Sequence, residues 1–226
     1  MIKKTFIRFG LLIGFTMLFA SCSRSYLVNY TISLSSVTKP KDAKAPYGSY
    51  DVKLVEEPYP KSIEGNMKGY NYKDDILDIT WYIGEDRFYF VLRNVSPYTI
   101  KINWDDISFV DLSGKAVKVV HSGIDKNNLN ILQPPITIPQ GANLVDELIP
   151  IKPSYNIAEQ SYEYRLVPCK YKTTKTFNAE TGAKYYAGKE LSIMMPVVIE
   201  NVQNDYTFTF KVGELYNVTF VNKKKY

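Results

Sequence analysis

The chain has 226 residues, of which 45% are hydrophobic, 14% are aromatic and 23% are charged. This apolar content is enough for a packed core, so the composition excludes wholesale disorder. The 12 Gly and 2 Cys exclude a collagen-like chain and a disulfide-stapled scaffold, and the length allows one large or two small domains.

The formal net charge of +5 overstates the charge expected of the mature chain. Residues 1–21 carry three basic and no acidic residues, and without them 25 basic and 23 acidic residues leave a net charge of +2. Three of these bases form a lysine run at 223–225, which we interpret as a solvated tail. The body is close to neutral and lacks the basic stripe typical of nucleic-acid binders, so no nucleic-acid partner is expected.

The first 21 residues have the layout of a secretory signal peptide. Residues 1–8 are basic, residues 9–19 are apolar apart from Gly and one Thr, and Ala20 and Ser21 are small. A transmembrane helix needs about 20 apolar residues, and this run has 11. We therefore predict a cleaved signal peptide over 1–21 and no membrane span.

The residue that follows is Cys22. The tetrapeptide FASC at 19–22 resembles the bacterial lipobox, whose cysteine is lipidated and becomes the first mature residue, although Phe19 stands where Leu is usual. This resemblance implies a lipoprotein anchored to the membrane by palmitate-type acyl chains rather than spanning it. Two alternatives stay open: an ordinary signal peptide that leaves Cys22 as a free thiol, or a disulfide from Cys22 to Cys169, which would constrain little.

Ser23 bears on the location. In lipoproteins with this motif, Ser after the cysteine is compatible with sorting to the outer membrane, whereas Asp retains the protein at the inner membrane. Some surface-displayed lipoproteins have an acidic run at this point, and residues 23–26 contain no acid. We therefore expect the bacterial outer membrane, with the periplasmic face favoured over the cell surface.

The rest of the chain divides into a tether and one domain. Residues 22–48 are expected to be a lipidated tether, with a strand over 27–34 and a linker rich in Lys, Ala and Pro over 37–46. From residue 49 to 226 the apolar residues recur with period two, which is typical of strands. We predict a β-sandwich domain over 49–226 without internal repeats.

A β-hairpin is the clearest local prediction. Residues 77–83 and 88–92 both alternate between apolar and polar side chains, and a short loop with Gly84 separates them. Further alternating segments predict strands at 100–104, 107–112, 116–121, 144–149, 162–167, 191–199, 206–212 and 216–220.

Many short strands with one wet face, and no helical stripe longer than two turns, indicate an all-β antiparallel sandwich. Two long irregular stretches, 125–135 and 171–188, interrupt the strands. Long loops in compact domains are often functional, so both stretches are candidates for a binding surface.

Residues 88–150 carry a second resemblance. Its elements are Asn94, Trp104-Asp105, Gly114, His121-Ser122-Gly123, Gln133-Pro134-Pro135, Ile138-Pro139-Gln140-Gly141 and Ile149-Pro150. In this pattern the chain resembles a group of uncharacterised bacterial envelope lipoproteins. The resemblance covers about a quarter of the chain and implies an immunoglobulin-like sandwich. It carries no activity and no catalytic residues.

His121 is the only histidine. As a general base it would act with Ser122 and would need an orienting acid, for which Asp105 or Asp111 could serve. It is in phase with the apolar positions of its strand, so we interpret it as a hydrogen-bonded structural residue. The sequence predicts no catalytic residue and no enzyme.

Metal and cofactor sites are not expected. One histidine and one cysteine besides Cys22 exclude the usual zinc arrangements. Asp125 opens a stretch similar to a calcium loop, but its fifth, sixth and twelfth positions lack the oxygen ligand, the glycine and the glutamate. The adjacent pairs Asp74-Asp75 and Asp105-Asp106 are interpreted as turn and cap residues, because neighbours on a strand face opposite ways. No nucleotide-binding glycine motif occurs.

Tyrosine is abundant, with 19 copies. Six of them are expected on sheet surfaces or in loops: Tyr70, Tyr72, Tyr82, Tyr89, Tyr185 and Tyr186. Exposed aromatic rings stack on sugars or anchor protein interfaces, which makes Tyr70, Tyr72, Tyr185 and Tyr186 a possible binding surface. The alternative is that they are ordinary strand residues favoured by β propensity.

These observations predict a non-enzymatic accessory or protein-binding lipoprotein of the bacterial envelope, with a lipid anchor, an envelope protein as partner and no cofactor. The alternative is a glycan-binding surface lipoprotein that uses exposed tyrosines and the loop at 171–188. An enzyme built on His121 and a pilin-like structural subunit are further hypotheses.

Overall fold

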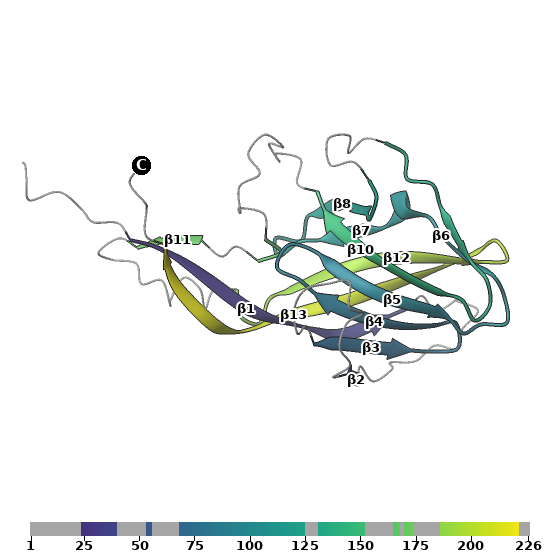
Figure 1. The fold of residues 1–226 in the computed structure, drawn as a ribbon, viewed down its shortest axis with the longest axis horizontal. Coiled ribbons are helices and arrows are strands. Elements are labelled where there is room, and N and C mark those ends of the chain that lie inside the picture. The colour runs from purple at the N-terminus through teal and green to yellow at the C-terminus, as the bar shows by residue number, and fades with distance from the viewer. Residues whose placement is uncertain are drawn as a thin grey trace, which may run out of the picture.

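A computed structural model of the chain describes residues 24–39, 53–55, 68–124, 131–151, 165–167, 170–173 and 186–221. In these residues the regular structure is antiparallel β-sheet with one turn of 3-10 helix, η2 (Trp104–Asp106). The strands form two sheets that pack against each other (Figure 1). No helix among the described residues is long and apolar enough to cross a membrane.

The first sheet is built on two long strands, β1 (Arg24–Thr38) and β13 (Val202–Val221), with β12 (Glu190–Ile199) on the other side of β13. Two short strands share the outer edge of β12, namely β7 (Ser108–Val110) and β6 (Ile100–Ile102). Pro196 lies between the part of β12 that pairs with β7 and the part that pairs with β6. Its lack of an N–H group therefore removes no hydrogen bond to either short strand. Two further strands extend the sheet: β9 (Ile136–Ile138) pairs with β6, and β11 (Lys170–Thr173) pairs with the amino end of β1.

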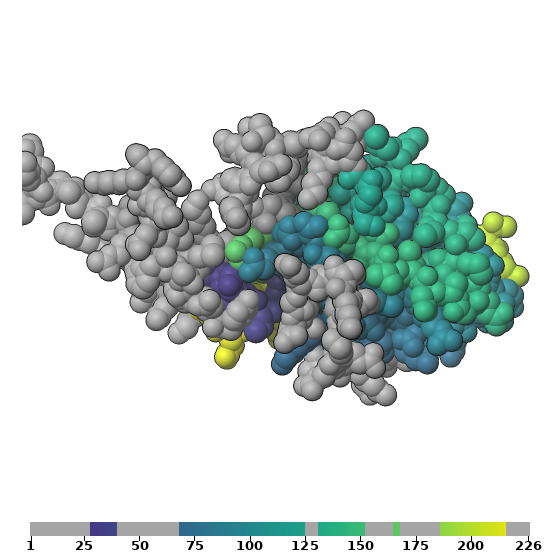
Figure 2. Space-filling model, in the orientation of Figure 1, coloured from purple at the N-terminus to yellow at the C-terminus, as the bar shows by residue number. Residues whose placement is uncertain are grey.

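The second sheet follows the order β10, β5, β4, β3, β2. Its strands are β10 (Asn143–Pro150), β5 (Phe88–Asn94), β4 (Leu77–Ile83), β3 (Gly69–Lys73) and β2 (Lys53–Val55). The strand β8 (Ala116–His121) pairs with β7 of the first sheet and with β10 of the second, so it joins the two sheets along one side. Figure 2 shows the continuous surface, teal to green, that the middle of the chain makes on one face of the sandwich.

The core is an aromatic cluster between the sheets. Trp81 on β4 is fully buried and meets Phe210 of β13 edge-on, with ring centroids 5.7 Å apart. Phe88 on β5 lies 4.8 Å from the same Phe210 ring. Inward positions alternate with half-exposed ones along β4 and β5, which is why the period-two pattern was visible in the sequence.

The turn between β12 and β13 has the backbone of a two-residue hairpin. Glu200 and Asn201 both have positive φ, at 45° and 67°. This left-handed conformation twists the hairpin in the sense that the flanking strands require, and asparagine tolerates it well. The turn takes only these two residues, so β13 begins at Val202, before the strand start predicted at 206.

The prediction of an all-β antiparallel sandwich is confirmed. The predicted hairpin at 77–92 is formed by β4 and β5, with Ile83 opposite Phe88, and β8 covers residues 116–121 as predicted. The strands predicted at 206–212 and 216–220 are one continuous strand, β13. Residues 165–167 form a bend, so the described end of the strand predicted at 162–167 is not a strand.

The segment expected to be a tether is the largest difference from the sequence-based prediction. Residues 24–38 form β1, which pairs with β13 over most of its length and buries Val28, Leu34 and Val37 in the core. The sandwich therefore includes residues that precede position 49. The predicted signal peptide and Cys22 lie outside the described residues, as do Asp125, Cys169 and Tyr185.

Candidate functional site

A polar network at the β7–β8 side of the sandwich contains His121, Ser122 and Asp105, which the sequence singled out as a possible catalytic group. It begins at η2, where Trp104 is buried and its carbonyl accepts a hydrogen bond from the Ile107 N–H at 3.2 Å. The Asn103 side chain closes the turn by donating to Asp106 at 2.7 Å. This tight turn leaves the neighbouring Asp105 directed toward β8.

Asp105 is held by a cation and an amide. Lys118 on β8 approaches its carboxylate to 3.1 Å, and Gln133 donates to it from the main-chain N–H at 3.1 Å and from the side chain at 3.2 Å. Burial by itself would raise the pKa of Asp105, but the hydrogen bonds from Gln133 and Lys118 and the charge of Lys118 together lower it. The carboxylate is therefore ionised at neutral pH.

Gln133 is the buried centre of the network. Only 2% of it is exposed, and its side chain also donates to the Val119 carbonyl and accepts from the His121 main-chain N–H at 3.0 Å. These bonds attach the segment before β9 to β8. Sequence reasoning noted Gln133 only as part of a Gln-Pro-Pro pattern, because the role of a buried amide depends on partners far away in the chain.

His121 has a structural setting. Its ring stacks on Trp104 at 4.3 Å and 10°, and its Nδ1 lies 3.3 Å from Asp146 on β10. Asp146 also accepts hydrogen bonds from the main-chain N–H groups of Ser122 and Glu147. The Nε2 atom is buried and has no hydrogen-bond partner among the described residues.

The hypothesis that Asp105 or Asp111 orients the His121 ring is therefore wrong. Asp146 takes that position, while Asp105 pairs with Lys118 and Asp111 closes the β7–β8 turn by accepting from Ser113 and Lys115. A general base must reach the proton it removes, and the Nε2 of His121 is closed off from solvent. Asp146 was missed because only the pairing of β10 with β8 brings it to His121.

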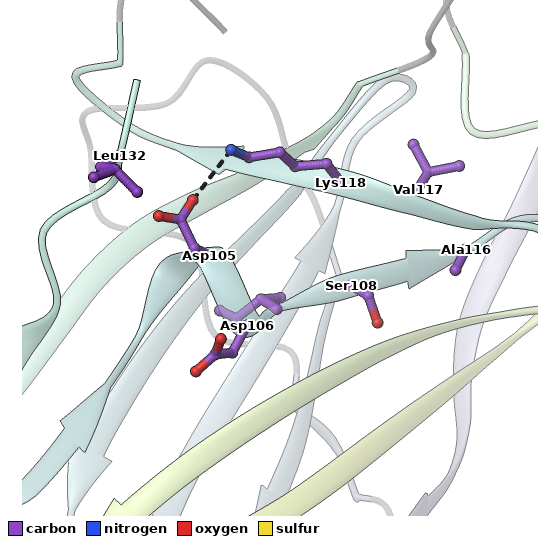
Figure 3. Close-up of a pocket in the computed structure, with 8 residues that line it drawn as sticks. Asp105, Asp106, Ser108, Ala116, Val117, Lys118 and Leu132 are labelled. Carbon is purple, nitrogen blue, oxygen red and sulfur yellow. Dashed lines mark ion pairs between the residues drawn. The ribbon is translucent and has the colours of Figure 1, made fainter. Parts of the chain in front are cut away.

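Next to this network lies a shallow hollow of about 380 Å³, shown in Figure 3. The ion pair of Asp105 and Lys118 forms part of its lining, together with Ser108 and Ala116. Leu132 stands beside the ion pair and is 82% exposed, the most exposed large apolar side chain among the described residues. The neighbouring Ile131 is also exposed.

The hollow combines apolar surface with fixed charges, which suits reversible binding of a polypeptide segment. An exposed ion pair of this kind contributes only about 0–1 kcal/mol to stability. A ligand could therefore pair with either charge while the fold loses little stability. The described part of the chain contains no group of three or more His, Cys, Asp or Glu side chains that could hold a metal ion.

The structure does not place the described tyrosines of the predicted binding surface together on the outside of the domain. Tyr72 is fully buried and Tyr82 nearly so, which makes the expectation that they are exposed wrong. Tyr70 is half-buried against the core, and its burial raises the pKa of its hydroxyl. Tyr186 is also half-buried, with its ring 6.2 Å from Tyr30. These tyrosines were expected on sheet surfaces or in loops, but the first sheet covers β3, and the Tyr72 ring contacts Tyr206 and Phe208 of β13.

A second polar cluster, inside the sandwich, was not predicted. Asp74 accepts hydrogen bonds from Lys39 at 2.6 Å, Tyr72 at 3.0 Å and Tyr206 at 2.9 Å. Its other oxygen accepts from the main-chain N–H groups of Ile76 and Leu77, so it is also the turn residue that was expected. The side chains of Lys39 and Asp74 are 2% and 0% exposed, which places this ion pair in the core as a structural bond rather than a binding site.

Comparison with known proteins adds no relative to this description. No family model matches the chain, and no curated protein or solved structure matches it significantly.

Proposed function

We propose that this chain is a non-enzymatic lipoprotein of the bacterial cell envelope that binds a protein partner through the hollow between η2 and β8. The observation that carries the binding role is the exposure of Leu132, at 82%, beside the fixed ion pair of Asp105 and Lys118. An exposed apolar side chain bordered by polar groups matches the arrangement of a protein interface, in which a polar rim surrounds an apolar centre.

The anchor rests on the sequence of residues 1–22. A basic segment, an apolar run and small residues precede Cys22, as in a bacterial lipoprotein signal. Since β1 begins at Arg24, only Ser23 separates the acylated cysteine from this first strand in this proposal. The outer membrane, with its periplasmic face, is the favoured location.

The partner that fits the hollow is an exposed segment of another envelope protein. An apolar side chain of that segment would pack on Leu132 and Ile131, and a polar group would meet the ionised Asp105 or the Lys118 ammonium. The enclosed Nε2 of His121 supports a non-catalytic role for the surrounding network. With Tyr72 buried, no observation favours the glycan-binding alternative.

The anchor is tested in cells by replacing Cys22 with Ala in the full chain. The wild-type protein is expected to take up labelled palmitate and to fractionate with the outer membrane, while Cys22→Ala loses both properties. Protease treatment of intact cells then reports the face, and digestion only after the outer membrane is opened indicates the periplasm. A Cys22→Ala protein that stays bound to the membrane would refute the lipid anchor.

The binding surface is tested with a photo-crosslinking residue at Ala116, an exposed position that lines the hollow. In cells of the native host we expect one protein adduct, reduced about tenfold or more by Leu132→Asp, because a buried charge at an interface centre costs several kcal/mol. The matched control is Val145→Asp, at an apolar side chain that is 49% exposed on β10. Equal adduct in the Leu132→Asp and control proteins would contradict the proposal.

A further inference from the structure

Asp106 brings a second carboxylate to the hollow between η2 and β8. It is exposed and lines the hollow together with Asp105 and Lys118 (Figure 3). Among the described residues, the ion pairs include Asp105 with Lys118, whose charged atoms lie 3.1 Å apart, and none of them involves Asp106. The described lining therefore carries two carboxylates and one ammonium group, an excess of one negative charge.

The turn of η2 fixes the position of the Asp106 carboxylate. The main-chain N–H of Asp106 donates to the Asn103 carbonyl at 3.2 Å, and the Asn103 side chain donates to the Oδ2 atom of Asp106 at 2.7 Å. These bonds occupy one carboxylate oxygen, and no described residue donates to the other, Oδ1. Since a carboxylate accepts hydrogen bonds through both oxygens, Oδ1 can accept from a ligand.

The charges of Asp105 and Lys118 are already used within the fold. The Oδ1 atom of Asp105 accepts from Lys118 and from the Gln133 side chain, and its Oδ2 atom accepts from the Gln133 main chain. An anionic side chain that approached Lys118 would also meet the carboxylates of Asp105 and Asp106, and like charges repel. A cationic side chain that approached Asp106 would meet a carboxylate with no cation of its own. The charge of the hollow therefore favours a cationic ligand.

The apolar contact of the hollow is held in a fixed place relative to these charges. Leu132, which is 82% exposed, directly precedes Gln133, and Gln133 is buried and bonded to Asp105. In the view of Figure 3, Asp105 lies between Leu132 and Asp106. A polypeptide segment that crosses the hollow would therefore meet apolar surface at Leu132 and negative charge at Asp106.

We propose that the hollow selects a basic polypeptide segment, in which a Lys or Arg side chain pairs with Asp106 and an apolar side chain nearby packs on Leu132. The inference rests on the proposed function and specifies the chemistry of the partner. Complementary charges at an interface fix the register of the two partners and exclude wrong ones, while the apolar contact excludes water. Acidic segments of other envelope proteins are disfavoured for the same reason.

The test uses the chain from residue 22 to 226 with Cys22→Ser, immobilised and exposed to a library of random short peptides displayed on phage. The enriched peptides are then synthesised with a fluorescent label, and their affinity is measured by fluorescence anisotropy. We expect the peptides that lose binding to Leu132→Asp to carry a Lys or Arg close to a large apolar residue, because these two side chains match the two contacts of the hollow.

The decisive variant is Asp106→Asn, which removes the charge and keeps an oxygen that can accept from Asn103. It is expected to weaken binding of these peptides about tenfold, and replacing the basic residue of the peptide with Gln is expected to do the same. Combining the two changes is expected to weaken binding no further, because both remove the same ion pair. The matched control is Asp75→Asn, an exposed aspartate in the turn from β3 to β4, which is expected to stay within about twofold of the unsubstituted chain.

Peptides that depend on Leu132 but bind Asp106→Asn as tightly as the unsubstituted chain would overturn this inference and leave the proposed binding role intact. Additive losses from the two changes, or equal losses in Asp106→Asn and the control, would also overturn it, since no specific ion pair would then form. If no selected peptide depends on Leu132, the inference fails as well, while the cross-linked adduct at Ala116 decides the binding role separately.

Discussion

Asp74 connects three parts of the sandwich through one carboxylate. Lys39 follows β1, Tyr206 belongs to β13, and Asp74 itself begins the turn from β3 to β4. Burial alone would raise the pKa of Asp74, but the hydrogen bond and charge of Lys39 and the main-chain donors at Leu77 and Ile76 lower it below the ordinary value.

This lowered pKa makes stability depend on pH in the acid range. A carboxyl group whose pKa is lower in the folded state stabilises the protein above its unfolded pKa, which is about 3.9 for Asp. We expect the free energy of unfolding to decrease as the pH falls below about 4 and toward the folded pKa of Asp74. Urea unfolding at a series of pH values measures this, and Asp74→Asn is expected to flatten the acid limb.

Asp74→Asn also leaves Lys39 buried without a countercharge. Removing one partner of a buried ion pair costs about 3–5 kcal/mol, whereas replacing both partners with uncharged side chains costs far less. The double variant Asp74→Asn with Lys39→Met is therefore expected to be more stable than Asp74→Asn. If urea unfolding shows the double variant to be the less stable, the ion pair does not act as described.

His121 is expected to contribute to stability through its stack on Trp104. His121→Phe keeps an aromatic ring there, and Asp146 retains the main-chain donors of Ser122 and Glu147. We expect His121→Ala to lose about 2–4 kcal/mol in urea unfolding and His121→Phe to lose less than half of that. Equal losses in the two variants would show that the bond to Asp146, not the stack, is the main contribution.

At the scale of the elements, the backbones of β1 and β13 approach each other closely at Gly213. A Cβ atom added to Gly213 would collide with the hydroxyl of Thr31 on the neighbouring strand, at the point where the ladder shifts register between Tyr30 and Ile32. A glycine inside a strand often marks such an approach of two backbones.

Gly213→Ala is therefore expected to destabilise the chain by about 1–3 kcal/mol through steric overlap. Thr31→Ala removes the hydroxyl that collides, so the double variant is expected to recover most of the loss. Thermal unfolding followed by circular dichroism compares the four proteins. Purely additive effects of the two substitutions would contradict the proposed contact.

Some strands could be predicted from the local alternation of apolar and polar residues, and others could not. β4, β5 and β8 lie where alternation placed them, because each of these strands has one face in the core and one outside. The strands β2, β3, β9 and β11 were missed, because strands of three to five residues carry few alternating residues. The rings of Tyr72 and Tyr82 were placed outside, because period two identifies two faces without saying which one another sheet will cover.

For the whole molecule, β1 decides where the folded domain begins. It supplies Val28, Leu34 and Val37 to the core, and the buried Lys39 follows it directly. All four residues precede the domain boundary expected at residue 49. Burying each apolar side chain stabilises a fold by about 1.5–3 kcal/mol, against a total stability of about 5–15 kcal/mol.

A chain that starts at residue 49 is therefore expected to fail to fold. It should show no cooperative unfolding transition in urea, whereas a chain that starts at residue 23 should show one. Cooperative unfolding of the shorter chain at comparable stability would place β1 outside the essential core and restore the predicted tether.

The sequence by itself determined the all-β class, the antiparallel sandwich and the near-neutral body, because these follow from composition and from the period-two alternation of its clearest segments. It also supplied the features of residues 1–22 on which the anchor is proposed. Tertiary structure decided the partners: Asp146 beside His121, Lys39 beside Asp74, and the start of β1 beside the end of β13. Such contacts depend on strand order and register, which arise only when distant segments share a core, and no local pattern records them.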